Sequence, residues 1–294
     1  MGYQNRRNQR NNRNNERNPI NDVISKINNL DKLCDMSVKD FADEGGYADI
    51  VAKNSRDLKT HQLRKFFAVV RAMEQKETLT WAEIEPEFYL LKPKLAVAVA
   101  RKNIKKPFYN LMMAVMNKVD RGSDEEKLFN FKYFISFFES IVAYHKFHEY
   151  KRKNERFRNV NNNIANIITK INSLSQLSDM PIKELADKDG YADTIAQNLK
   201  NLNTNQLRKF FAYVRLMEQK ESLIWTDVLN EFYLLKPKLA IAVGRGNIPW
   251  DFYDLMLAVM KKVDIGSDED KIENFKVFVS LFESIVAYHK FYDS

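Results

Sequence analysis

The sequence predicts an all-α protein built as two tandem antiparallel helical bundles of five to six helices each. Three observations predict this class. The second half of the chain repeats the first at a constant offset of 144 residues. Glycine and proline are scarce, at 8 and 7 of 294 residues. Apolar residues recur with helical rather than alternating spacing. Each repeat has the size of a domain and is too long for a solenoid unit, so a duplicated domain is predicted.

The two repeats are most alike in three blocks. Residues 60–77 match 204–221 at 15 of 18 positions, residues 88–101 match 232–245 at 12 of 14, and residues 136–147 match 280–291 at 11 of 12. The chain therefore contains its own comparison of two related sequences. Residues that both repeats keep are the first candidates for function.

The helices of the first bundle follow from local patterns. Residues 20–33 are amphipathic and predict the first helix, and another begins near Tyr47. Apolar side chains between residues 60 and 76 share one helix face. Pro93 and Pro237 are expected in the first turn of the next helix, where the missing N–H needs no partner.

Two further helices complete the bundle. One is predicted over residues 105–119, and a capping box at Ser123 opens the last, over about residues 125–147. The polar segment that follows is either a flexible tether or, in its first half, an extension of that helix. The predicted organisation is a disordered basic Asn/Arg-rich tail (1–18), a first bundle (19–148), a basic linker (149–162) and a second bundle (163–294).

The net charge of +8 lies mostly outside the predicted bundles, because the tail carries a net +4 and the linker a net +3. A basic disordered arm attracts polyanions through counterion release. The alternative is a solubilising tail without a specific role. A single cysteine, Cys34, excludes a disulfide framework. No apolar run approaches the roughly 18 residues of a membrane span, and no secretory signal is recognisable. We expect a cytoplasmic protein without membrane contact.

Cations kept in both repeats are the candidate binding residues. Arg64 and Arg71 are seven residues apart and share a helix face away from the apolar stripe. The full set is Arg64, Lys65, Arg71, Lys92, Lys94 and Arg101 in the first repeat and Arg208, Lys209, Arg215, Lys236, Lys238 and Arg245 in the second. Such a pattern fits a track for a phosphate backbone, since Arg binds phosphate bidentately and Lys acts as a point charge. A merely solvated helix face is the alternative.

An enzyme is not expected. His145 and His289 are kept, but His145 continues the apolar stripe, so a core or helix-end histidine with a satisfied hydrogen bond is the better interpretation. No kept nucleophile, carboxylate pair, metal cluster or glycine-rich phosphate loop accompanies them. We therefore expect no catalytic residue, no metal and no cofactor. Most of the aromatic residues fall on apolar stripes, where core packing explains them.

Three motifs occur in the same order in both repeats. In the first they are Thr-x-Gln-Leu-Arg-Lys-Phe-Phe (60–67), Lys-Pro-Lys-Leu-Ala and a small-residue run ending in Arg (92–101), and Glu-Ser-Ile-Val-Ala-Tyr-His-Lys (139–146). Together they resemble the small subunit of type III-A CRISPR interference complexes, the Csm small-subunit family. The resemblance covers most of residues 45–148 and 189–291.

The resemblance implies a non-enzymatic helical bundle in antiviral defence. Family members stack along the inner face of an effector filament and contact the backbone of guide RNA paired with target RNA. The implied partners are these RNAs, the backbone subunits and the large signalling subunit. The cations that it carries over are Arg64, Lys65, Arg101, Arg208, Lys209 and Arg245; the four lysines 92, 94, 236 and 238 are added from helical geometry.

Two features depart from the family pattern. Val97 and Ile241 stand where the family has a tyrosine, and this chain holds two copies where the usual member has one. The predicted function is an RNA-binding structural subunit that fills two consecutive small-subunit positions. The alternative is a helical protein-interaction adaptor that binds acidic protein partners through the same faces.

Overall fold

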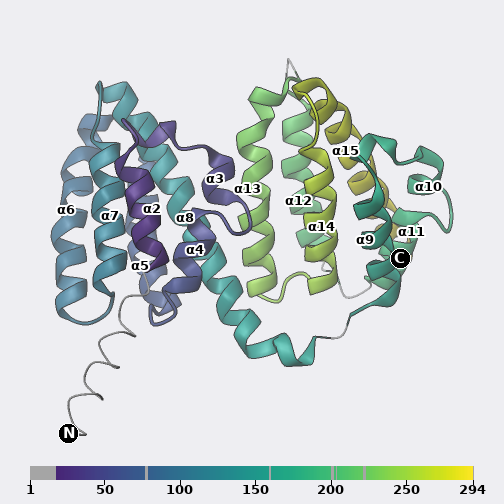
Figure 1. The fold of residues 1–294 in the computed structure, drawn as a ribbon, viewed down its shortest axis with the longest axis horizontal. Helices are drawn as coiled ribbons and strands as arrows, with labels where there is room; N and C mark the ends of the chain where they lie inside the picture. The colour runs from purple at the N-terminus through teal and green to yellow at the C-terminus, as the bar shows by residue number, and fades with distance from the viewer. Residues whose placement is uncertain are drawn as a thin grey trace, which may run out of the picture. The chain divides into compact units, whose positions relative to one another are not determined.

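The computed structural model describes residues 18–76, 79–158, 160–199, 202, 204–220 and 223–293. These residues divide into two compact units, and each is described by itself. The first is drawn from residues 1–37 and 45–141, and the second from residues 38–44 and 142–294. Helices and turns but no strands occur in these ranges, which confirms the all-α class (Figure 1). Apart from Asn18, the predicted tail lies outside the described residues.

The helices of the first unit are α2 (Pro19–Asn28), α4 (Tyr47–Asn54), α5 (Thr60–Glu74), α6 (Trp81–Ala100), α7 (Lys106–Val119) and the first part of α8 (Asp124–Asn154), with the 3-10 turn η1 (Leu33–Asp35). α2 packs against α7 and α4, and α6 contacts both α5 and α7 (Figure 1). The Asn18 side chain caps α2 by accepting a hydrogen bond from the Ile20 N–H.

The second unit contains α3 (Val38–Ala42), the end of α8 from Val142, η2 (Glu155–Phe157), α9 (Asn162–Ser173), η3 (Leu177–Asp179), α10 (Ile182–Ala186), α11 (Tyr191–Asn198), α12 (Thr204–Glu218), α13 (Trp225–Gly244), α14 (Trp250–Val263) and α15 (Asp268–Tyr292). α15 packs against α11, α12 and α14, and α9 packs against α14. The short helix α3 belongs to the first sequence repeat, yet it packs against α13 in this unit.

Buried phenylalanines form the centre of each unit. Phe88 on α6 meets Phe131 and Phe134 of α8 edge to face, with ring centroids 6.0 and 6.1 Å apart. One repeat later, Phe232 meets its two partners on α15 in the same way. Edge-to-face aromatic pairs add to the stabilisation from burial. The assignment of these aromatic residues to the core therefore agrees with the structure.

The prediction that prolines open a helix was wrong. Pro93 lies inside α6 and Pro237 inside α13, each more than ten residues after the helix begins. An interior proline removes a backbone hydrogen bond and costs about 3 kcal/mol. Phe88, Leu91 and Leu95, on both sides of Pro93, are all buried. Their packing holds the helix together through the proline.

The last helix of the first repeat is longer than predicted. α8 continues to Asn154, so the first part of the segment predicted as a linker is helical. Of the two alternatives for that segment, the helical extension is the one present. The predicted domain boundaries remain a prediction, because they follow the sequence repeat and not the division into units.

A buried asparagine links separate segments in each repeat. Asn130 on α8 accepts a hydrogen bond from the Cys34 N–H at 2.9 Å and donates to two carbonyls of the α7–α8 turn at 3.3 Å. Asn274 does the same in the second repeat, accepting from the Ser178 N–H at 2.7 Å. Because all the polar atoms involved find partners, burial of these amide groups carries little penalty.

Candidate nucleic-acid interface

Arg64 and Lys65 lie in the first turns of α5 and point their charges into solvent. Both are exposed, and neither forms an ion pair with any residue that the structure describes. Leu63, on the other side of the helix, is buried in the first unit and fixes this orientation. Arg208 and Lys209 occupy the same exposed positions on α12. The structure thus leaves four of the predicted cations available for a partner.

Arg71 and Arg215 have partners on their own helices. Arg71 forms an ion pair with Glu74 at 2.5 Å, and its guanidinium carbon lies 5.9 Å from the centre of the Phe67 ring. Arg215 pairs with Glu218, also at 2.5 Å, and lies over Phe211. These two arginines are half-buried and locally neutralised, so they contribute less free positive charge than Arg64 and its counterpart.

Arg101 and Arg245 cap the ends of α6 and α13. After Arg101, the Lys102 N–H donates to the Val99 carbonyl at 2.8 Å and the Asn103 N–H to the Ala98 carbonyl at 2.9 Å, which is a Schellman motif. The second repeat closes α13 in the same way. Both arginines are exposed and form no ion pair within the described part of the chain. The motif therefore fixes where each arginine leaves its helix.

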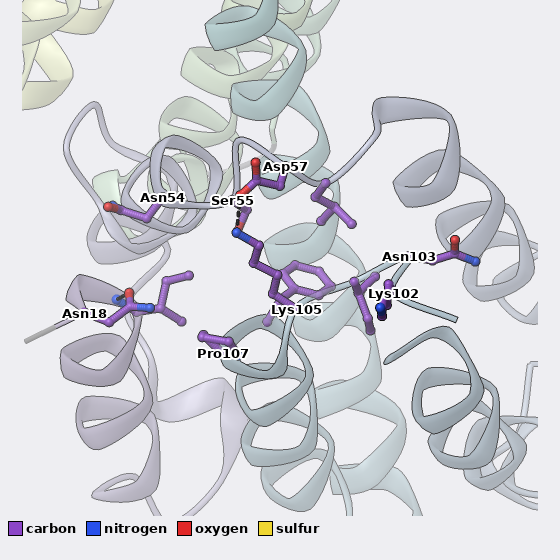
Figure 2. A pocket seen from close by; sticks show the side chains of 12 residues that line it. Asn18, Asn54, Ser55, Asp57, Lys102, Asn103, Lys105 and Pro107 are labelled. Atoms are coloured by element: carbon purple, nitrogen blue, oxygen red, sulfur yellow. Dashed lines mark hydrogen bonds and ion pairs between the residues drawn. The ribbon is translucent and has the colours of Figure 1, made fainter. Parts of the chain in front are cut away.

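A pocket shows that the start of α5 and the end of α6 lie together. It is lined by residues that precede α5, among them Asp57 and Leu58, and by residues 102–105 that follow α6 (Figure 2). Lys105 bridges the two segments through an ion pair with Asp57. Arg64, near the start of α5, and Arg101, at the end of α6, consequently lie at the same end of this helix pair.

The four lysines that flank the prolines differ in environment. Lys94 is exposed and has no ion pair with a described residue. Lys92 is half-buried, with its ammonium group 3.5 Å from the side-chain oxygen of Asn117. Lys238 lies 3.8 Å from the centre of the Tyr213 ring. Lys236 is only 2% exposed and forms an ion pair with Asp43 at 2.6 Å. Burial of Lys236 was not foreseen from its helical position.

Tyr213 is a residue that the sequence analysis did not single out. It is exposed on α12, and the Lys238 side chain from α13 covers it. This contact joins the outer faces of the two helices into one surface. The sequence did mark this position by a difference between the repeats: Val69 of the first repeat stands where the second has Tyr213.

The two kept histidines lie in the helical interior. His145 on α8 and His289 on α15 are both buried. The ring nitrogens of His289 have no hydrogen-bond partner among the described residues, contrary to the satisfied hydrogen bond that we expected. The described residues contain no group of His, Cys, Asp or Glu that could hold a metal ion. Among the described helices, none is both long and apolar enough to cross a membrane.

Comparison with known proteins gives one match. The family model described as Csm2 Type III-A matches residues 38–151 and again residues 182–294. The two matched regions lie in the two sequence repeats and together cover most of the chain. No curated protein and no solved structure matches.

Proposed function

Because the chain belongs to the Csm2 Type III-A family and is a structural subunit of a type III-A CRISPR complex, we propose that it binds the backbone of guide RNA and target RNA. Through its two small-subunit copies it would also bridge neighbouring subunits of that complex. The RNA contacts are assigned to cations at the shared end of each helix pair. Lys236 stands apart from this group, since its ammonium group is already paired with Asp43. Lys92 also stands apart, since it is half-buried with its ammonium group near Asn117.

One observation carries the proposal. Cations at matching positions of the two repeats are exposed and lack acidic partners among the described residues, namely Arg64, Lys65, Arg101, Arg208, Lys209 and Arg245. Other cations on α5 or just after its end, such as Arg71 and Lys76, are paired with glutamates. Unpaired cations at fixed positions are the groups that release counterions when they meet phosphates.

Backbone contacts of this kind position a protein without reading the bases. The exposed Arg side chains can bind phosphate oxygens with two parallel hydrogen bonds, while Lys supplies a point charge. We therefore expect binding that depends on salt and is independent of RNA sequence. A subunit that must accept any guide RNA requires this property.

Two copies in one chain favour simultaneous occupation of neighbouring sites. Once the first copy is bound, the second binds at an effective concentration on the order of mM for a short connection. The fused chain should then bind a duplex long enough for both copies more tightly than a short one. It would also add small-subunit positions to the complex in pairs.

The decisive test removes the central arginine from both copies. In the double variant Arg64→Glu/Arg208→Glu, the dissociation constant for two RNA duplexes of unrelated sequence should rise by the same factor, at least about tenfold. The slope of log K against log salt should become shallower by about two, one unit for each lost phosphate contact. Fluorescence anisotropy with labelled duplexes at several salt concentrations measures both quantities.

A matched control changes the net charge equally at another site. Lys132 and Lys276 are exposed counterparts on α8 and α15, and Lys132→Glu/Lys276→Glu should leave RNA affinity close to that of the unchanged chain. Equal weakening by both double variants would mean that only net charge matters. Unchanged affinity and salt slope in the arginine variant would reject the proposed site. Loss of binding to an acidic protein partner instead would favour the adaptor function.

A further inference from the structure

The two repeats carry opposite charge at the turn that follows α6 and α13. Residues 102–110 of the first repeat contain three lysines and no acid, which gives a net charge of +3. Residues 246–254 of the second contain two aspartates and no cation, which gives a net charge of −2. The arginine just before each segment, Arg101 or Arg245, is the same in both. The same turn of a duplicated domain is therefore suited to different partners in the two copies.

In the second unit, this turn binds a segment of its own chain. Arg158, which precedes α9, pairs with Asp254 on α14, and its guanidinium carbon lies 5.5 Å from the centre of the Trp250 ring. The Asn161 N–H donates to the Asp251 carboxylate at 3.1 Å. Two acids and an aromatic ring thus hold a cationic segment across the first turn of α14.

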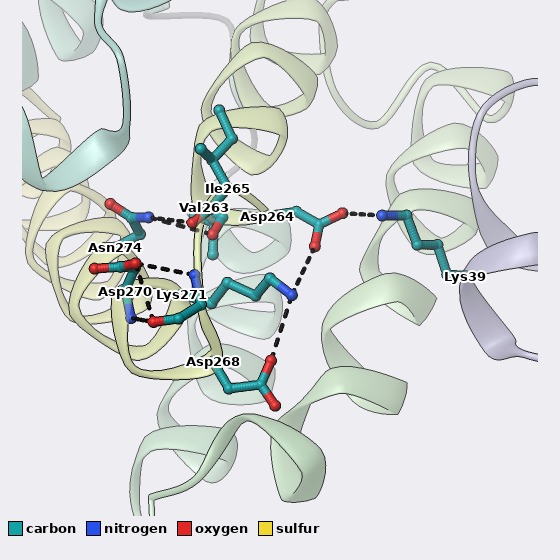
Figure 3. Close-up of polar contacts among 9 residues, drawn as sticks. Lys39, Val263, Asp264, Ile265, Asp268, Asp270, Lys271 and Asn274 are labelled. Carbon is teal, nitrogen blue, oxygen red and sulfur yellow. Dashed lines mark hydrogen bonds and ion pairs between the residues drawn. The ribbon is translucent and has the colours of Figure 1, made fainter.

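The other end of α14 also uses an acid to hold a separate segment. Asp264, directly after α14, pairs with Lys39 of α3, and its other oxygen faces Lys271 at 4.0 Å (Figure 3). The first repeat keeps this acid as Asp120, whose carboxylate lies 3.5 Å from the ammonium nitrogen of Lys127. The two repeats therefore agree in charge at the end of this helix and differ at its start.

The start of α7 has cations where the start of α14 has acids. Lys106 stands in the place of Trp250, and Pro107 and Asn110 replace the two aspartates. The N-cap residue Lys105 supplies no side-chain acceptor to the first turn of α7. The partial positive charge of the helix start therefore adds to the charge of the lysines. This turn would repel a cationic segment and attract an anion.

Further cations surround the pocket beside this turn. The pocket has a volume of about 180 Å³, and Lys102 and Lys105 line it together with Asn54 and Asp57 from the end of α4 and the segment after it (Figure 2). Asp57 is the one acid among its described lining residues, and it is paired with Lys105. We call this pocket the basic pocket. Six cations line it or neighbour its lining residues in the chain, namely Lys53, Arg56, Lys59, Lys102, Lys105 and Lys106.

The cations of the basic pocket are available to a ligand. All six are exposed, and among them Lys105 alone forms an ion pair with a residue that the structure describes. Lys102 also keeps a side chain in the left-handed backbone region, where its counterpart Gly246 is free of strain. Backbone strain of this kind is concentrated at functional sites.

The size of the basic pocket limits what it can take. Pockets that enclose a whole small molecule measure about 300–1,000 Å³. The basic pocket is smaller, at about 180 Å³, so it accommodates one group of a larger ligand. A phosphate on a polymer is such a group, and its charge complements the lysines.

We propose that the basic pocket binds a backbone phosphate of RNA, and that only the first copy has such a site. This inference rests on the proposed RNA-binding function. The RNA passes from Arg101, at the end of α6, to Lys102 and Lys106, whose ammonium groups bind the phosphate oxygens. In the second copy, Arg158 already occupies the equivalent turn. The two copies therefore hold RNA unequally, and the chain lies along it in one direction.

Reversing the charge of the basic pocket tests this site. For Lys102→Glu/Lys106→Glu, the dissociation constant for an RNA duplex should rise at least about tenfold, and the slope of log K against log salt should become shallower by about two. The control Lys132→Glu/Lys276→Glu changes the net charge equally and should bind like the unchanged chain. Fluorescence anisotropy measures binding. All four lysines are exposed, so both variants should fold, which circular dichroism checks.

A second variant should strengthen binding, which a folding defect cannot imitate. Asp57→Asn removes the acid of the basic pocket and releases Lys105 from its ion pair. The RNA affinity should rise, and the salt slope should steepen by about one. Glu283→Gln, at an exposed position on α15, removes the same charge elsewhere and should give no gain. Equal affinity of the Asp57 and Glu283 variants would count against the basic pocket.

Lysine acetylation followed by mass spectrometry locates the contact on the unchanged full chain. RNA should protect Lys102 and Lys106 from acetylation and leave Lys132 reactive. Absence of this protection, or equal weakening by the two lysine double variants, would overturn the proposal. If Lys102→Glu/Lys106→Glu binds like the unchanged chain while Arg64→Glu/Arg208→Glu does not, the basic pocket is rejected and the proposed RNA function stands. If neither variant loses affinity, both are rejected.

Discussion

Lys102 holds a backbone φ of 57°, in the left-handed region that glycine adopts without strain. Its counterpart Gly246, at the equivalent position in the cap of α13, has a φ of 71°. A Cβ at Gly246 would meet no atom within 4 Å. The conformation of the backbone, and not a lack of space, therefore makes a side chain unfavourable at this position.

The change Lys102→Gly should raise the free energy of unfolding of the first unit by about 0.5–1 kcal/mol, since it removes the left-handed penalty but adds disorder to the unfolded chain. Urea titration followed by circular dichroism measures the change. Lys102→Ala keeps the Cβ and should give no such gain. A glycine variant less stable than the unchanged chain would show that the Lys102 side chain contributes contacts that outweigh the strain.

The start of α15 is closed by reciprocal hydrogen bonds between Ser267 and Asp270. The Ser267 N–H donates to the Asp270 carboxylate at 2.9 Å, and the Asp270 N–H donates to the serine hydroxyl at 3.2 Å. The first repeat has the predicted box with Glu126. We predicted only a helix start at Ser267, because the box normally has Glu or Gln as its fourth residue. The shorter Asp side chain makes the same contact.

Stability at the Asp270 cap should depend on pH. The hydrogen bond from the Ser267 N–H lowers the pKa of Asp270 below that of an unfolded chain. A lowered folded-state pKa adds stability above the unfolded value, and this stability is lost as pH falls through the folded value. Asp270→Asn should therefore be less stable than the unchanged chain at pH 7, with the difference closing in acid.

Thermal unfolding of both chains across the acid range measures this effect. Glu269→Gln is the matched control, because it removes a charge from the same first turn and leaves the box intact. A constant difference between the Asp270 variant and the unchanged chain at every pH would show that the effect does not come from ionisation of this carboxylate.

At the scale of elements, α13 depends on a glycine at its last position. Gly244 lies so close to the backbone of α8 that an added Cβ would come within 2.9 Å of the Phe147 nitrogen. Backbone atoms cannot yield as a flexible side chain can. Gly244→Ala should therefore destabilise the second unit by about 1 kcal/mol, even though alanine favours helix formation by a similar amount.

Differential scanning calorimetry should show this loss as a lower melting temperature. The counterpart change Ala100→Gly is the control and should cost the first unit about 1 kcal/mol of helix propensity. If Gly244→Ala proves neutral, the end of α8 can shift on α13.

Most helices could be predicted from the sequence, because their apolar spacing is strong and is repeated in both halves. The prolines were misplaced, since local rules assign them to a helix start and only tertiary packing shows that α6 continues through Pro93. α3 was missed for a related reason. It has five residues, too few to show a period, and it is held by contacts with a helix almost 200 residues away.

At the scale of the whole molecule, the repeat and the family resemblance predicted the class and the tandem organisation, and both are confirmed. They could not predict that equivalent residues differ in burial. Lys92 and Lys236 are identical in sequence context, yet only Lys236 is covered by α3. A comparison of the repeats identifies positions of the same type. Which of them is exposed depends on contacts that the repeat itself does not encode.

The paired asparagines have one more consequence. Asn130 and Asn274 hold the backbone N–H groups of Cys34 and Ser178, which are counterparts in the two repeats. Neither amide proton can exchange with solvent until its asparagine releases it. Each unit therefore carries its own slow-exchanging amide at the same place in the fold. Deuterium uptake at these two sites would report the opening of one unit independently of the other, within a single unlabelled chain.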